Sequence, residues 1–162
     1  MMHDSLCKSR AKSPGFSSRS RSRVCAMKCL YRYFLLNDAQ RTNEEPYSNL
    51  RCVLDTDSDY FRCNKDYFEV LFAGIGDYMR EILECLSKCL DRPISRVTPV
   101  EMAILVVSVF ELLYQKNVPA PVVINEAVEL AKVYGGTDGY KYVNNVLDKL
   151  STEIKESIAA TV

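Results

Sequence analysis

The stretch TPVEMAILVVSVFELLY, residues 98–114, decides the fold class. Thr98 can accept the backbone N–H of Glu101, and the Glu101 side chain can reach back to residue 98, which is the capping-box pattern of a helix start. Pro99 suits the first helical turn, where its missing N–H is not needed. Apolar residues then follow nearly all round the helix. The sequence therefore predicts a buried central helix over residues 99–116.

The segments on both sides of this stretch repeat apolar residues every three or four positions, which is the period of a helix. No alternating run favours a strand. The predicted fold class is therefore all-α, a compact helical bundle of about six to seven helices. The expected helices, besides the central one, cover residues of about 19–37, a short stretch after Pro46, 65–90, 119–134 and 139–157.

Two features interrupt this helical pattern. The acidic segment Asp55–Asp59 contains three aspartates and is expected to be a solvated loop. Gly74 and Gly76 lie inside the predicted helix 65–90, where each costs up to about 1 kcal/mol relative to alanine. Glycines there suggest that another backbone comes close.

The length of 162 residues suits one domain with a core of its own. Residues 1–17 have no periodicity, and we expect a disordered tail of Ser, Arg and Lys. The expected single domain covers residues 18–157, followed by a short C-terminal tail, 158–162.

The net charge of zero conceals an uneven distribution. Residues 1–32 contain eight Lys or Arg and one acid, a net charge of +7, whereas residues 33–162 carry 13 Lys or Arg and 20 acids, a net of −7. A basic arm on an acidic body suggests a polyanionic partner, and a merely solvated tail is the alternative.

Seven cysteines, an odd number, occur in the chain. Residues 1–16 hold no apolar signal-peptide core, and no apolar run approaches the length of a membrane span. Free thiols in a reducing cytosol are the simplest interpretation. An Arg- and Ser-rich start also fits an organelle transit peptide.

Catalytic and metal-binding patterns are weak. His3 is the only histidine, and no Gly-rich phosphate loop occurs. The acidic segment begins like a calcium loop, but Tyr60 occupies the position that needs glycine. The i, i+4 pairs Cys25/Cys29 and Cys85/Cys89 fit small core residues better than zinc ligands. We therefore expect no enzyme activity, metal or cofactor.

Arginines are concentrated at the predicted start of the first helix. Arg19, Arg21 and Arg23 alternate with serines, and Lys28 and Arg32 follow. Guanidinium groups match phosphate oxygens with two parallel hydrogen bonds, and a helix N-terminus also favours anions. These five cations predict a site that binds RNA phosphates.

Two tyrosines follow the same stretch. Tyr31 and Tyr33 can offer rings on which unpaired bases stack. Tyr31 shares a helix side with Val24 and Met27, so a half-buried core position is the alternative for that residue.

Several ordered pieces of the chain resemble the NusB family. They span roughly residues 19–152 and read RSRVCA at 21–26, LFAG at 71–74, AIL at 103–105, VINEAVELAK at 123–132, and YVN with VLDK at 142–149. The resemblance implies an all-helical fold and a non-catalytic bacterial transcription antitermination factor. Such a factor acts in the cytoplasm.

The resemblance also implies partners. NusB-like proteins pair with the ribosomal protein NusE, and the pair binds the single-stranded boxA element of nascent RNA, notably in ribosomal RNA operons. The complex then joins NusA, NusG and RNA polymerase. By the same resemblance, the RNA-facing residues are Arg19, Arg21, Arg23, Asp138, Lys141 and Tyr142, and the NusE-facing residues are Tyr31 and Glu101.

The chain departs from the family pattern at three positions. Val106 stands where Arg is frequent, Gly139 where Ser is usual, and Asn145 where Gly is frequent. An alternative function is a helical scaffold that associates with itself, for example as a homodimer, with an incidental basic tail.

Overall fold

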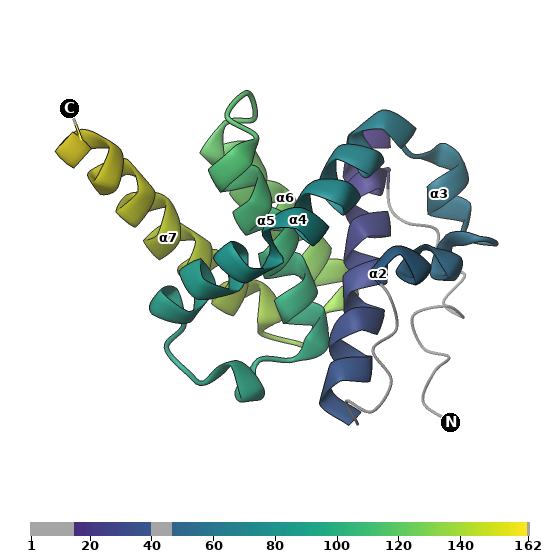
Figure 1. Cartoon of the computed structure of the whole chain (residues 1–162), viewed down its shortest axis with the longest axis horizontal. Helices are drawn as coiled ribbons and strands as arrows, with labels where there is room; N and C mark the ends of the chain where they lie inside the picture. Colours follow the sequence, from purple (N-terminus) through teal and green to yellow (C-terminus); the bar gives the residue numbers. More distant parts are fainter. Residues whose placement is uncertain (1–14, 40–46, 162) are drawn as a thin grey trace.

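The computed structural model describes residues 15–39 and 47–161. The predicted all-α fold is confirmed, since the described residues form helices and contain no strand (Figure 1). Most of the expected N-terminal tail, 1–17, lies outside the described residues. The elements are α2 (Ser18–Ala39), the 3-10 helix η1 (Tyr47–Leu54), α3 (Ser58–Arg62), α4 (Lys65–Cys89), the 3-10 helix η2 (Ile94–Arg96), α5 (Pro99–Tyr114), α6 (Ala120–Tyr134) and α7 (Gly139–Thr161).

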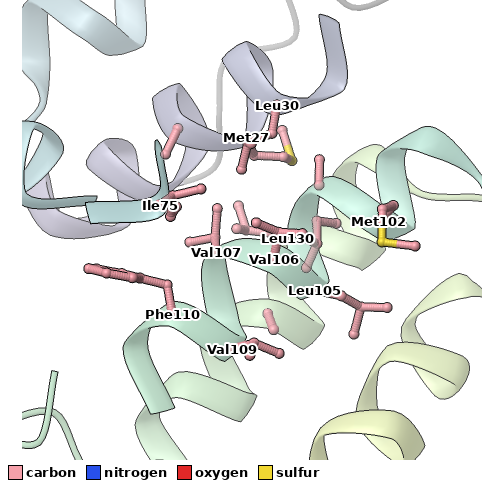
Figure 2. Close-up of a cluster of buried hydrophobic side chains, with 14 of the residues drawn as sticks. Met27, Leu30, Ile75, Met102, Leu105, Val106, Val107, Val109, Phe110 and Leu130 are labelled. Atoms are coloured by element: carbon pink, nitrogen blue, oxygen red, sulfur yellow. The ribbon is translucent and has the colours of Figure 1, made fainter. Parts of the chain in front are cut away.

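Helix α5 is the centre of the bundle. Its capping box is present: Glu101 N donates to Thr98 Oγ1 at 3.2 Å, and Thr98 N donates to Glu101 Oε2 at 3.1 Å. Every residue from Glu101 to Glu111 is buried. Helices α2, α4, α6 and α7 all contact α5, and Figure 2 shows its side chains packed against Met27, Leu30 and Leu130. Burial of each large apolar side chain contributes about 1.5–3 kcal/mol.

The two glycines of α4 accommodate aromatic rings rather than another backbone. A Cβ atom on Gly74 would overlap the Phe110 ring of α5, and one on Gly76 would lie 2.7 Å from Cε1 of Tyr47. The expectation of a close backbone was therefore wrong, because aromatic rings are the nearest neighbours at both glycines. Helix α4 also bends at Tyr78, which has non-helical angles (φ −113°, ψ 17°).

The first turns of α2 and α4 are joined by hydrogen bonds. Asn64 caps α4 by accepting from Tyr67 N, and its own N–H donates to the carbonyl of Ser18 at 3.0 Å. Ser22 Oγ donates to the carbonyl of Asn64 at 2.7 Å. These hydrogen bonds hold the start of α4 against the arginine-rich start of α2.

Two segments differ from expectation. Residues 58–62 form the short helix α3, because Asp57 Oδ1 caps it by accepting from Asp59 N and Tyr60 N. Helix α7 continues to Thr161 instead of ending near residue 157, so the described part of the expected C-terminal tail is helical. Within the described ranges, none of the helices is long and apolar enough to cross a membrane.

Candidate nucleic-acid interface

Two of the serines that alternate with the arginines of α2 face the bundle. Ser20 and Ser22 are buried. Ser20 Oγ donates to Glu126 Oε1 of α6 at 3.0 Å, and Ser22 binds the start of α4. Small hydroxyl side chains let α2 approach both helices while each buried oxygen keeps a partner.

Arg23 lies inside the protein, contrary to what a direct phosphate contact requires. Its Nε donates to Glu111 Oε1 at 2.7 Å and its Nη2 to Glu111 Oε2 at 2.9 Å. Tyr67 OH also donates to Glu111 Oε2, at 2.6 Å, and Glu126 lies 3.6 Å from Arg23 Nη1. The side chains of Arg23 and Glu111 are 5% and 1% exposed, so the guanidinium is already neutralised by a buried carboxylate.

This buried network shifts the protonation of its members. Burial lowers the pKa of Arg23, but the hydrogen bonds and charge of Glu111 outweigh it and leave that pKa above its usual value. Burial, followed by the charge of Glu111, raises the pKa of the Tyr67 hydroxyl. Arg23 therefore stays charged and Tyr67 stays neutral at physiological pH.

Arg21 and Lys28 are held by the acidic segment Asp55–Asp59. Arg21 Nη1 lies 2.6 Å from Asp59 Oδ1, and Lys28 Nζ lies 2.6 Å from Asp57 Oδ2 and 3.2 Å from Asp59 Oδ2. Burial lowers the pKa of Lys28, but the hydrogen bond that Lys28 donates to Asp57, together with the charge of that carboxylate, outweighs it and raises the pKa above its usual value. The expected solvated loop was wrong here, since Asp59 is only 4% exposed.

The remaining cations of α2 are Arg19 and Arg32, which differ in exposure. Arg19 is exposed, with its guanidinium carbon 4.8 Å from the centre of the Tyr67 ring. Arg32 is half-buried. Tyr31 and Tyr33 are half-buried and pack against the core, so the core position that was the alternative for Tyr31 describes its placement.

The residues expected at the start of α7 form a second group. Asp138 and Lys141 are exposed and form an ion pair of 3.2 Å, whose hydrogen bond raises the pKa of Lys141. Tyr142 is 8% exposed, and the guanidinium carbon of Arg92 lies 4.0 Å from its ring centre. Within the described residues, the buried Tyr142 hydroxyl has no hydrogen-bond partner. A stacked base would therefore first have to displace Arg92.

Glu101 belongs to this second group. It is 8% exposed, and a Cβ on Gly139 would lie 3.2 Å from Glu101 Oε1. Glu101 and Glu111 are ten residues apart on α5, which is about 15 Å along the helix axis. Because Glu111 binds Arg23, the structure separates the arginine group from the α7 group by roughly that length.

Sequence reasoning missed the acids that hold these cations. Glu111 had a detectable signal, because a single acid deep in an apolar helix needs a buried partner. Of the three departures from the family pattern, Val106 is fully buried, Gly139 adjoins Glu101 and Asn145 is exposed.

The cysteines follow the core interpretation. Cys25, Cys29 and Cys89 are buried, and Cys85 is half-buried. Burial raises the pKa of Cys29 to about 12. The described ranges contain no group of three or more His, Cys, Asp or Glu residues arranged to hold a metal ion.

Together these features define a small all-α protein whose first helix carries a row of ion-paired cations. The chain belongs to the NusB family, whose model matches residues 20–152. It is 41% identical over 139 residues to the transcription antitermination protein NusB of Burkholderia lata, covering 86% of this chain and 91% of that protein. The NusB of Paraburkholderia xenovorans is 39% identical over 140 residues, covering 86% and 92%.

The fold comparison agrees. A solved structure of NusB from T. maritima aligns with a TM-score of 0.69 at 27% identity, covering 85% of this chain and 94% of that chain. The resemblance drawn from the sequence motifs is therefore confirmed at the level of family and fold.

Proposed function

We propose that this chain is a transcription antitermination factor that binds boxA-type single-stranded RNA together with NusE. The observation that carries the proposal is the family match over residues 20–152, joined to relatives that are themselves transcription antitermination proteins. In this proposal the pair acts on ribosomal RNA operons in the bacterial cytoplasm, with NusA, NusG and RNA polymerase. The role is binding rather than catalysis.

The RNA surface of the proposal combines two groups of cations. Arg19 and Lys141 are exposed and can reach a phosphate directly. Arg21, Lys28 and Arg32 lie near the surface of α2. A flexible single strand of RNA can bridge the roughly 15 Å between the groups, which is the rise of ten helical residues. Tyr142 and Asp138 then contribute at the start of α7.

Arg23 has a different role in this proposal. Because its guanidinium is paired with buried Glu111, it positions the first turns of α2 instead of touching RNA. A charge held in a fixed, desolvated pair cannot transfer to a phosphate without leaving Glu111 unpaired. In this proposal Arg19 and Arg21 of the arginine-rich motif contact RNA, and Arg23 anchors α2 to α5.

The NusE surface is assigned to Tyr31 and Glu101. Tyr31 is half-buried and keeps part of its ring accessible. Glu101 already receives the backbone N–H of Thr98 on Oε2. A partner would therefore donate hydrogen bonds to the acceptor positions of the Glu101 carboxylate that the N–H of Thr98 leaves open.

A titration of fluorescent boxA-type RNA with the whole chain, with and without NusE, tests the proposal. We expect NusE to raise the RNA affinity, and a scrambled RNA of equal length to bind more weakly. RNA affinity that is unaltered by NusE and equal for both RNAs would refute the proposal. Sedimentation of the free chain in the same buffer tests self-association, the alternative function.

A further inference from the structure

We propose that Asp57 and Asp59 compete with RNA for Arg21 and Lys28, so that the acidic segment restrains RNA binding until it is displaced. This inference rests on the proposed function, because it needs an RNA site on α2. It adds a regulatory contact to that site.

Asp59 bridges Arg21 and Lys28 on one side of α2. Arg21 and Lys28 are seven residues apart, two helical turns, and therefore lie on one side of α2. Asp59 reaches both cations, with Oδ1 at 2.6 Å from Arg21 Nη1 and Oδ2 at 3.2 Å from Lys28 Nζ. Asp57 adds a second bond to Lys28 at 2.6 Å. The two carboxylates therefore take up hydrogen-bonding positions on Arg21 and Lys28 that a phosphate would also need.

Carboxylate and phosphate groups can compete for the same two cations. Carboxylate and phosphate oxygens bind Arg and Lys through the same charge-assisted hydrogen bonds. The side chains of Arg21 and Lys28 remain 12% and 14% exposed, so these pairs lie at the rim of the protein. The Arg23–Glu111 pair, by contrast, is sealed inside. A polyanion can therefore approach the first two cations and not the third.

Helix α3 carries Asp59, the acid that contacts both cations. The only buried residue of this five-residue helix is Asp59, an acid and not an apolar side chain. Phe61 is 71% exposed, and Tyr60 contributes an edge contact to the Phe68 ring at 5.6 Å between centroids. Helix α3 packs beside α2 (Figure 1), where the ion pairs of Asp59 and the partly buried Tyr60 hold it. The cations of these pairs are 12% and 14% exposed, whereas Arg23 and Glu111 are 5% and 1% exposed, so releasing α3 uncovers less fully buried charge than opening the Arg23–Glu111 pair would.

A double variant, Asp57→Asn with Asp59→Asn, tests this competition. Asn caps a helix as well as Asp does, so α3 keeps its start while both negative charges are removed. The matched control is Asp55→Asn with Asp66→Asn, which removes the same charge from neighbouring exposed positions. Thermal unfolding followed by circular dichroism verifies that both variants fold.

The measurement is RNA affinity for the boxA-type oligonucleotide across a salt series. We expect the Asp57/Asp59 variant to bind roughly tenfold more tightly than the control variant at low salt. Its plot of log affinity against log salt should steepen by about 1.4, which is about 0.7 for each of two phosphates gained. Hydrogen exchange of the α3 amides should rise when the wild-type chain binds RNA.

Each outcome decides a separate question. If the wild-type chain binds RNA while both folded variants have equal affinity and slope, the competition is refuted and the proposed function stands. A variant that binds more weakly than its control also refutes it, because the pairs would then only support the fold. If neither the wild-type chain nor the variants bind the RNA, both the proposed function and this inference fail.

Discussion

Arg23 and Glu111 form a two-point ion pair inside the bundle, with Nε–Oε1 and Nη2–Oε2 distances of 2.7 and 2.9 Å. The pair joins the first helix to the central one, and Tyr67 of α4 donates to the same carboxylate. One arginine of a motif rich in arginine therefore serves the fold, which makes effects on stability separable from effects on RNA.

We expect Glu111→Gln to lower the free energy of unfolding by about 3–5 kcal/mol, because it leaves the buried Arg23 charge without its counter-charge. Urea unfolding measures the loss. The control is Glu84→Gln, which breaks the exposed pair with Arg80 and should cost no more than about 0.5 kcal/mol.

Replacing both partners provides a second check on this pair. Arg23→Met with Glu111→Leu removes both buried charges, so it should destabilise the chain less than Glu111→Gln alone. A double variant that is less stable than the single one would contradict the account of Arg23 as a desolvated anchor.

Gly74→Ala should destabilise the chain by about 1–3 kcal/mol, because the added methyl group overlaps the Phe110 ring. Gly136→Ala is the matched control, since nothing lies within 4 Å of a Cβ at that position. Thermal unfolding of the two variants compares them. Equal losses would mean that the Phe110 ring moves aside without cost.

Glu101→Gln should separate capping from partner binding. Glutamine at this position can still bind the N–H of Thr98, so the free energy of unfolding should change by less than about 1 kcal/mol. Affinity for NusE should nevertheless fall if the charge of Glu101 is the contact, and titration calorimetry measures it. Unchanged NusE affinity would remove Glu101 from the partner surface.

Alkaline pH should destabilise the fold through Cys89. Burial, together with the hydrogen bond to Glu153, raises the pKa of Cys89 from 9.0 to about 11. Between those values the unfolded chain has lost this proton and the folded chain has kept it, so the free energy of unfolding falls as pH rises. Below pH 9 this group contributes no slope.

Urea unfolding from pH 8 to 11 checks the effect. Lys28 and Tyr67, whose pKa values are also raised, add falls of the same sign above their ordinary values. Cys89→Ala should therefore reduce the slope between pH 9 and 11 without abolishing it. An identical slope in this variant would show that Cys89 titrates normally.

Arg19→Ala should weaken RNA binding and make the salt dependence shallower by about 0.7, the value of one phosphate contact with a single strand. Arg19 is exposed and lies over the Tyr67 ring, so the free energy of unfolding should fall by no more than about 1 kcal/mol. Arg80→Ala, which removes another exposed arginine, is the control. A slope that is the same for both variants would place the RNA away from Arg19.

Most of the fold could be predicted because long helices have a clear apolar period and recognisable capping residues. Residues 98–114 carry a capping box and a predominantly apolar helical run, and the structure has the helix Pro99–Tyr114 there. Helix α3 has five residues, fewer than two turns, so it offers no period to detect. What Gly74 meets depends on Phe110, which is distant in sequence.

The candidate site was less predictable for a related reason. The pattern of Arg19, Arg21 and Arg23 reveals three arginines at the start of a helix. It does not reveal which acids pack against them in the folded chain. Arg23 turns inward because Glu111 is buried at the matching level of α5. A sequence pattern cannot distinguish an arginine that is available to bind phosphate from one that is already paired with a carboxylate.

The hydrogen bonds that join the starts of α2 and α4 also limit how the chain length can vary. Helix α2 has 22 residues, about 33 Å, so the 25 residues from 40 to 64 must return the chain over that distance. A fully extended return needs about ten residues. Deletions in this connection therefore meet a fixed lower bound, whereas residues inserted between its short helices cost little, about 0.6 kcal/mol of closure entropy for each doubling of a flexible loop. Among homologous chains, length differences should accumulate in this connection and not in the helices it joins.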